Sequence, residues 1–216
     1  MNFFVMGRVE DEFSFTGLKL CTVFVLVFGF QSFTGFNPGF RPGEPFWKFF
    51  TSFFGHSGIE HLTNNLFFIA LFGSIYEKWT SSKMFIGTFL FSAVIGNLAA
   101  FIFFPDSFII GASAGGMGLM AALATYKPNQ IGLGLGVPLP MWTVLITYIF
   151  IDFSGLTATT NVANEAHLLG VLAGILTGYN LRGQKYGKKK DQSDFNVEEG
   201  SWKQRIRNWE EKYMMD

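Results

Sequence analysis

Residues 111–124 read GASAGGMGLMAALA, which sets one serine among small and apolar residues with no charge in the stretch. Small residues on an apolar helix let neighbouring helices approach closely within a membrane. A polar side chain is costly in such a segment and usually marks a working site. Ser113 is therefore the first candidate functional residue, and the stretch around it predicts a helix packed inside a bundle.

Outward from this stretch, the chain contains six apolar segments close to the length of about 17–25 residues that a spanning helix needs. The segments cover about residues 14–34, 58–76, 84–104, 109–126, 137–154 and 162–180. A soluble, Phe-rich helical bundle is the alternative, but its helices would need charged outer faces, and runs such as 67–72 and 85–91 have none. Only 15% of the residues are charged. We predict an all-α polytopic membrane protein, a bundle of six transmembrane helices.

Basic residues predict the orientation of this bundle, because cytoplasmic connections carry an excess of Lys and Arg. The connections after the second and fourth segments hold Lys78, Lys83 and Lys127, and residues 182–190 are also rich in basic residues. An even number of spans places both termini on one side, so we expect both in the cytoplasm. The first outer connection, about residues 35–55, is aromatic, which predicts a partly buried interfacial loop.

The expected domains follow the change between polar and apolar sequence. We expect an N-terminal cytoplasmic segment over residues 1–13, a six-span domain over 14–181 and a basic tail over 182–216. Trp202, Ile206, Trp209 and Tyr213 recur at helical spacing in the tail, which indicates either an amphipathic helix on the inner leaflet or a contact with a partner. The 16 basic and 16 acidic residues balance, so no nucleic-acid partner is expected.

Three even-numbered segments carry polar side chains at similar distances from their outer ends. His61 lies about three residues into the second segment, Ser113 about four into the fourth, and His167 about five into the sixth. At about 1.5 Å per residue these depths agree within a few Å, and Asn65 shares a helix face with His61. We expect these side chains to meet in one layer just below the outer surface, where water can reach them.

These residue types fit the hydrolysis of a peptide bond. A serine hydroxyl becomes a nucleophile when a base takes its proton, and His167 is the base best placed by depth. The same imidazole can return the proton to the leaving amine. The oxyanion needs fixed donors, which the Asn65 amide, an imidazole nitrogen of His61 and the backbone N–H of Ser113 can supply. The pattern predicts a serine protease acting within the membrane, with no metal or cofactor.

Neighbouring residues are expected to shape this site. Gly111 and Gly115 flank the serine without side chains, which leaves room for a substrate backbone. Gly170 and Gly174 follow the histidine of the sixth segment with the spacing of closely packed helices. His56 is expected at the outer rim of the site.

Each element also has a simpler interpretation. A serine in a Gly/Ala-rich helix often only packs, and membrane histidines can bridge helices or bind a metal. Gly111–Gly115 fit the Gly-x-Ser-x-Gly turn of α/β-hydrolases, but that turn needs a preceding strand, which the surrounding apolar segments exclude. Two functions without proteolysis stay open, a protein that escorts membrane clients and a transporter or channel. Asn97, deeper in the third segment, is expected to bond to a neighbouring helix.

The order and spacing of these motifs resemble the rhomboid family of intramembrane serine proteases over about residues 15–180. The matching motifs are Gly-x-Ser at 111–113, Ala-His-x-x-Gly-x-x-x-Gly at 166–174, and HSGIEHLTNN at 56–65. The resemblance implies a Ser113–His167 dyad without a catalytic carboxylate, oxyanion donors from His61 and Asn65, and transmembrane proteins as substrates.

The chain departs from the family pattern at three positions. Ala114 stands where Gly usually follows the serine, Met117 stands where an aromatic residue often packs on the histidine, and Lys48 follows Trp47 where Arg is usual. Lys lacks the planar fork of donors that Arg has. The reacting groups are all retained, so the departures leave open an altered rate, an altered substrate choice, or a catalytically weak or inactive rhomboid-like protein that binds or escorts transmembrane clients. With no targeting peptide evident, we expect a prokaryotic plasma membrane, with the active site opening to the outer face.

Overall fold

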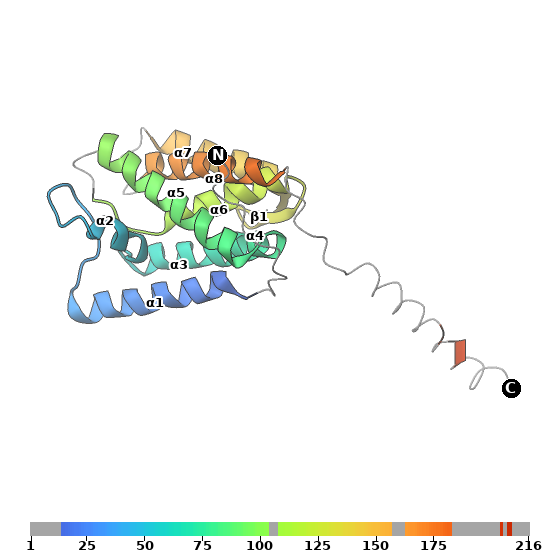
Figure 1. The fold of residues 1–216 in the computed structure, drawn as a ribbon, viewed down its shortest axis with the longest axis horizontal. Coiled ribbons are helices and arrows are strands. Elements are labelled where there is room, and N and C mark those ends of the chain that lie inside the picture. The colour runs from blue at the N-terminus through green and yellow to red at the C-terminus, as the bar shows by residue number, and fades with distance from the viewer. Residues whose placement is uncertain (1–13, 104–107, 157–162, 183–203, 205–206, 209–216) are drawn as a thin grey trace. The chain divides into compact units, whose positions relative to one another are not determined.

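The structure is a computed structural model, which describes residues 14–103, 108–156, 163–182, 204, 207 and 208. Most of these residues are helical (Figure 1), as the sequence predicted. The elements in chain order are α1 (Thr16–Thr34), α2 (Lys48–Thr51), η1 (Ser52–Phe54), α3 (Ile59–Phe68), η2 (Ile69–Gly73), α4 (Ser74–Trp79), α5 (Ser82–Phe103), α6 (Ser113–Tyr126), β1 (Ile131–Gly134), β2 (Val137–Pro140), α7 (Met141–Gly155) and α8 (Asn164–Arg182). η1 is a 3₁₀ turn, and η2 is a π-helical turn that joins α3 and α4 into one continuous helical segment.

Within the described ranges, two helices are long and apolar enough to cross a membrane. These are α1 and α5, while α7 is apolar but shorter. Large apolar side chains are exposed along α1 and α7, among them Phe33 at 94% and Phe150 at 71%. Contiguous apolar surface of this kind marks contact with a membrane or a partner. The six membrane spans expected from the sequence therefore stay a prediction.

Helix α6 is the central helix of the bundle. Every residue from Ala114 to Ala124 is buried, and the helix contacts α5, α7, α8 and the α3–α4 segment. All of these residues are small or apolar, so no face of α6 needs water. Burial on all sides fixes the position of the first residue of α6, which is Ser113.

The segment before α6 is extended rather than helical. Phe40 and Ile109 exchange two backbone hydrogen bonds of 2.9 Å, and the N–H of Gly111 donates to the Ser52 carbonyl at 2.8 Å. Gly111 has φ 124°, which a side chain would disfavour. Helix α6 therefore starts at Ser113, later than the expected residue 109, and its 14 residues span about 21 Å.

Residues 137–140 were expected in the fifth helix but form a hairpin strand. β2 pairs antiparallel with β1, with Gly134 opposite Val137. Leu135 and Gly136 have φ of 52° and 81°, and two successive positive φ values suit the twist of a tight hairpin. Pro138 and Pro140 lack the N–H groups that a helix interior uses, so α7 begins directly after the second proline.

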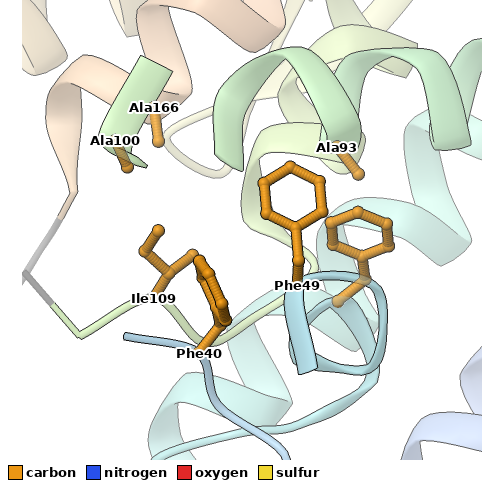
Figure 2. Packing of buried hydrophobic residues seen from close by; sticks show 7 residues of the cluster. Phe40, Phe49, Ala93, Ala100, Ile109 and Ala166 are labelled. Atoms are coloured by element: carbon orange, nitrogen blue, oxygen red, sulfur yellow. The ribbon is translucent and has the colours of Figure 1, made fainter. Parts of the chain in front are cut away.

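The connection between α1 and α3 folds onto the bundle, as its aromatic content predicted. Phe40, Phe49 and Phe53 are buried and pack with Ile109. Figure 2 shows the Phe40 and Phe49 rings beneath small residues of α5 and α8. The rings contribute most of the packing, because the small residues Ala93, Ala100 and Ala166 leave room for them.

Asn97 of α5 holds this connection in place. Its Nδ2 donates to the Phe49 carbonyl at 2.9 Å and to the Ser52 hydroxyl at 2.8 Å. The expected hydrogen bonding of Asn97 is confirmed, but its partners belong to α2 and η1 rather than to a spanning helix. The same side chain therefore links the core of α5 to the connection that precedes α3.

A buried carboxylate ties together the opposite ends of α1, α4 and α5. Glu77 accepts hydrogen bonds from the Ser14 hydroxyl at 3.0 Å, the Thr16 N–H at 2.9 Å and the Ser82 hydroxyl at 2.8 Å. The Thr16 hydroxyl also donates to it. Glu77 lies just beyond the second apolar segment, and burial alone would raise its pKa, but these hydrogen bonds hold the pKa below the ordinary value.

Two compact units divide the chain, Met1–Gly183 and Gln184–Asp216. In the second unit the structure describes only residues 204, 207 and 208, all of them helical. The tail residues expected to form an amphipathic face, at positions 202, 206, 209 and 213, lie outside the described residues.

Candidate active site

Ser113 occupies the N-terminal end of α6, where it is half-buried. The first N–H groups of any helix lack partners within the helix, and they carry a partial positive charge. A hydroxyl at this position therefore sits beside ready hydrogen-bond donors. The neighbouring Gly115 is needed for packing, since an added Cβ would lie 2.5 Å from the Phe89 ring.

Helices α6 and α8 pack backbone to backbone through small residues. A Cβ added to Gly170 would lie 2.4 Å from the Ala114 carbonyl oxygen, and one added to Gly174 would lie 2.2 Å from the Gly118 carbonyl oxygen. The expected close packing at Gly170 and Gly174 is thus confirmed. Since Ala114 follows the serine and Gly170 lies one turn after His167, this contact brings the two helix starts together.

Gly96 of α5 supports the same junction from a third side. A Cβ added there would lie 2.5 Å from the Ala114 Cβ and 2.9 Å from the Ala166 carbonyl oxygen. The residues next to Ser113 and His167 in the chain therefore both contact one glycine. Ala114, a departure from the family pattern, fits this site because Gly96 leaves space for its methyl group.

His167 is half-buried in the first turn of α8 and pairs with a carboxylate. Its Nδ1 lies 2.9 Å from Oδ1 of Asp152, which is buried in α7. The structure thus adds an acidic side chain that the resemblance did not imply. Among the hydrogen bonds of the described residues, none joins His167 to the Ser113 hydroxyl. Catalytic hydrogen bonds are often long before substrate binds and tighten in the complex.

His61 faces the segment that leads into Ser113. A Cβ added to Gly111 would lie 2.6 Å from Cε1 and 2.7 Å from Nε2 of the His61 ring, so only glycine fits there. The other ring nitrogen, Nδ1, lies 3.0 Å from the Ser57 hydroxyl. If that hydroxyl donates, the proton of the neutral ring sits on Nε2, the edge directed at Gly111.

His56 was expected at the outer rim, and that position stays a prediction. Its side chain is buried, and its ring packs edge-to-face against His61 at 5.2 Å and against Phe24 at 5.4 Å. Its backbone is fixed by Gln31, which bonds to both its N–H and its carbonyl. The His56 ring therefore lies between Phe24 of α1 and the His61 ring, and it supports the position of His61.

Asn65 lies one turn after His61 and is buried. Its Nδ2 donates to the His61 carbonyl at 3.0 Å. The amide nitrogen carries two N–H bonds, so one donor is left for another acceptor. This bond fixes the amide relative to the imidazole on the same helix.

The other expected site-shaping residues lie around this core. Met117 is buried one turn into α6. Lys48 forms a salt bridge of 3.2 Å with Glu44, and Trp47 stacks on Phe36. These contacts keep Lys48 and Trp47 within the α1–α3 connection. In the described part of the chain, no three His, Cys, Asp or Glu side chains converge where a metal ion could bind.

A family model described as Rhomboid domain matches residues 43–184, about two thirds of the 216 residues. The chain belongs to the rhomboid family. Rhomboid proteins are embedded in membranes, and the apolar helical segments of this chain fit transmembrane helices.

Three relatives illustrate the similarity. Rhomboid-like protease 3 of Toxoplasma gondii is 29% identical over 130 residues, covering 60% of this chain and 49% of the relative. Rhomboid-related protein 1 of Caenorhabditis elegans is 29% identical over 153 residues, covering 67% and 42%. Rhomboid protease GluP of Bacillus subtilis is 26% identical over 143 residues, covering 65% and 27%. The rhomboid chain described here thus spans about half or less of the length of these relatives.

Asp152 is the site residue that the sequence reasoning missed. It is the only charged residue in the apolar run 137–154. An ionisable residue within a membrane helix is by default a functional candidate, so the signal was present. Polar residues were compared by depth only in the even-numbered segments, whereas Asp152 lies near the end of the fifth segment, on α7.

Proposed function

We propose that this rhomboid is an intramembrane serine endopeptidase, with Ser113 as nucleophile and His167 as base. The observation that carries the proposal is the packing of α6 on α8. The Ala114–Gly170 contact and the shared contact with Gly96 hold the two helix starts together. The names of two relatives, Rhomboid-like protease 3 and Rhomboid protease GluP, support the same activity.

The chemistry proceeds by an acyl-enzyme. Nε2 of His167 takes the hydroxyl proton while the Ser113 oxygen attacks the scissile carbonyl carbon, whose π electrons move to its oxygen. The imidazolium then gives that proton to the leaving amine as the C–N bond breaks. Water, deprotonated by the same imidazole, attacks the acyl-enzyme, and the proton returns to the serine as the C–O bond breaks. No cofactor is required for any step.

The proposed oxyanion site lies between the N-terminal end of α6 and the side chains of His61 and Asn65 on α3. The Ser113 N–H lies at the N-terminus of α6, and the Nε2 edge of His61 lies against Gly111, two residues before the serine. The second N–H of the Asn65 amide is the third donor. Removing one such donor typically lowers kcat by about 10²–10³-fold, so substitutions of His61 and Asn65 test the two side-chain donors.

We propose further that residues 14–181 form a six-span domain with both termini in the cytoplasm and the site open to the outer face. The basic connections support this orientation. Substrates are transmembrane proteins whose helix unwinds locally near the cut. The domain lies between a cytoplasmic segment at 1–13 and a cytoplasmic tail at 182–216, and the membrane is the plasma membrane of a prokaryote.

Cleavage of a single-span substrate in detergent tests the function. Wild type is expected to release two fragments, whereas Ser113→Ala and His167→Ala release none. The matched control is Ser154→Ala, since Ser154 is an exposed serine whose hydroxyl donates to the Ile151 carbonyl of its own helix. Equal cleavage by wild type and Ser113→Ala would remove the assignment. Binding of the substrate without cleavage by wild type would favour a client-binding role instead.

A further inference from the structure

Asp152 carries a buried charge on an otherwise uncharged helix. It is 4% exposed, while its neighbours Ile151 and Phe153 are 41% and 67% exposed. Its Oδ1 contacts His167 Nδ1 at 2.9 Å, and its Oδ2 has no hydrogen-bond partner among the described residues. Burying a half-satisfied carboxylate is costly. The hydrogen bond to His167 is the interaction that offsets part of this cost.

The ionisable groups around the His167 ring are few. Asp152 faces it from α7, and His61 lies close enough on α3 to interact electrostatically. Glu165 lies two positions earlier on α8 itself, on another helix face. The other helices packed on α8, namely α5 and α6, carry no ionisable side chain in the described residues except Lys83 and Tyr126 at their far ends. Asp152 is thus the one carboxylate in contact with the ring.

We propose that Asp152 is a positioning residue that orients His167 as the base for Ser113. Its carboxylate accepts the Nδ1–H of the neutral ring, which leaves the lone pair on Nε2 free for the serine proton. When the ring takes that proton, the nearby negative charge stabilises the imidazolium. Asp152 itself neither gains nor loses a proton. The inference rests on the proposed serine protease function and adds a third member to its site.

A purely structural clamp between α7 and α8 is the competing explanation. In a clamp, His167 would be permanently protonated and paired with Asp152, and a protonated ring cannot accept the serine proton. The two explanations differ in the tautomer of His167 and in the pH dependence of serine reactivity. Removing one partner of a buried pair destabilises the protein under either explanation, so melting temperature alone does not separate them.

A fluorophosphonate probe measures serine reactivity without a known substrate. The serine oxygen forms a bond to phosphorus, fluoride leaves, and His167 Nε2 takes the hydroxyl proton. The second-order labelling rate of the full chain in detergent is measured against pH for wild type, Asp152→Asn and Ser154→Ala. We expect Asp152→Asn to label more slowly by on the order of 10²–10⁴-fold. The acid limb of its pH–rate profile should also change, because the neutral amide no longer faces the ring with a negative charge.

A second measurement reports the tautomer directly. The chain contains three histidines, so ¹⁵N-histidine labelling gives three rings, and His167→Ala assigns the relevant one. We expect wild-type His167 to carry its proton on Nδ1 at neutral pH, and Asp152→Asn to lose this preference. A doubly protonated ring in wild type, or an Nε2–H ring, would overturn the proposal.

The labelling outcomes separate this proposal from the proposed function. Asp152→Asn labelled at the wild-type rate with an unchanged acid limb would overturn the role of Asp152 and leave the protease assignment standing. A slower rate with an unchanged acid limb would identify a helix clamp and also overturn it. A wild type that the probe never labels would overturn the protease function, and the role of Asp152 with it.

Discussion

Two polar clusters in the same bundle differ in how fully the hydrogen-bonding groups of their buried side chains are satisfied. Around Glu77, both carboxylate oxygens accept hydrogen bonds from Ser14, Thr16 and Ser82. In the cluster around Ser113, both ring nitrogens of His56 and Oδ2 of Asp152 have no partner among the described residues. Buried polar groups are normally satisfied, and exceptions call for an explanation. The first cluster holds helices together, and the second is the one that we propose to act on substrate.

This contrast predicts that the two clusters fail differently when they are mutated. His167→Ala should lower substrate cleavage by at least about 10³-fold, because no other base is placed to take the serine proton. Its melting temperature should also fall, because the buried Asp152 carboxylate loses its partner, so cleavage is compared at a temperature at which both proteins are folded. Cleavage rate and thermal unfolding in detergent are the two measurements. A large loss of stability with cleavage retained would invert the comparison.

Glu77→Ala should show the reverse pattern. Four donors lose their common acceptor, and we expect a loss of about 3 kcal/mol, because hydrogen bonds to a charged group are worth about 1.5–3 kcal/mol each. Thermal unfolding checks the stability, and cleavage by the fraction that stays folded should be close to wild type. Glu60→Ala is the control, since Glu60 is exposed on α3. Similar melting temperatures for the two variants would contradict the structural role of Glu77.

The pH dependence of stability sharpens the role of the Glu77 cluster. Because its pKa lies below the ordinary value of 4.5 in the fold, its ionised form stabilises the protein above about that pH. The contribution should fade as the pH falls through the lowered pKa. The melting-temperature difference between wild type and Glu77→Gln should therefore be full at neutral pH and shrink in acid. A difference that stays constant with pH would show that charge plays no part.

A smaller effect is expected at the α6–α8 contact that links the two halves of the site. In Gly174→Ala the new Cβ would lie 2.2 Å from the Gly118 carbonyl oxygen, and overpacking of this kind costs about 1–3 kcal/mol. Gly29→Ala on α1 is the matched control, because nothing lies within 4 Å of its added Cβ. That control should be neutral or gain up to about 1 kcal/mol from helix propensity. Equal melting temperatures would rule out close packing at Gly174.

The smallest effect is expected at Lys48, far from either cluster. Its salt bridge with Glu44 is partly exposed, and such pairs are worth about 0.2–1 kcal/mol. Lys48→Met should leave the melting temperature nearly unchanged. Cleavage should also persist, because the connection is held by Asn97 and by the buried phenylalanine rings. A loss of cleavage comparable to His167→Ala would assign Lys48 to the site.

Much of this architecture was readable from the sequence, for a physical reason. Apolar segment length and the spacing of small residues are local signals, so the helices and the packing at Gly170 and Gly174 could be predicted. The start of α6 could not, because it depends on the distant bridge between Phe40 and Ile109 and on the His61 ring over Gly111. The hairpin before α7 was missed because its strands are apolar, although Pro138 and Pro140 mark it.

The candidate site was likewise predictable only in part from the sequence. The residue types at 113 and 167 and their similar depths were sufficient to nominate a nucleophile and a base. The burial of His56 could not be predicted, since it depends on Phe24 of α1, which is distant in the sequence. Asp152 was missed because a contact between α7 and α8 cannot be inferred from either segment alone.

The central claim is that Ser113 and His167 act as one reactive pair, and mass spectrometry of the fluorophosphonate adduct tests it most directly. Wild type should gain one adduct, on the peptide that contains Ser113, and His167→Ala should gain none while remaining folded. An adduct on another serine, or labelling of Ser113 that persists without the His167 imidazole, would contradict the account.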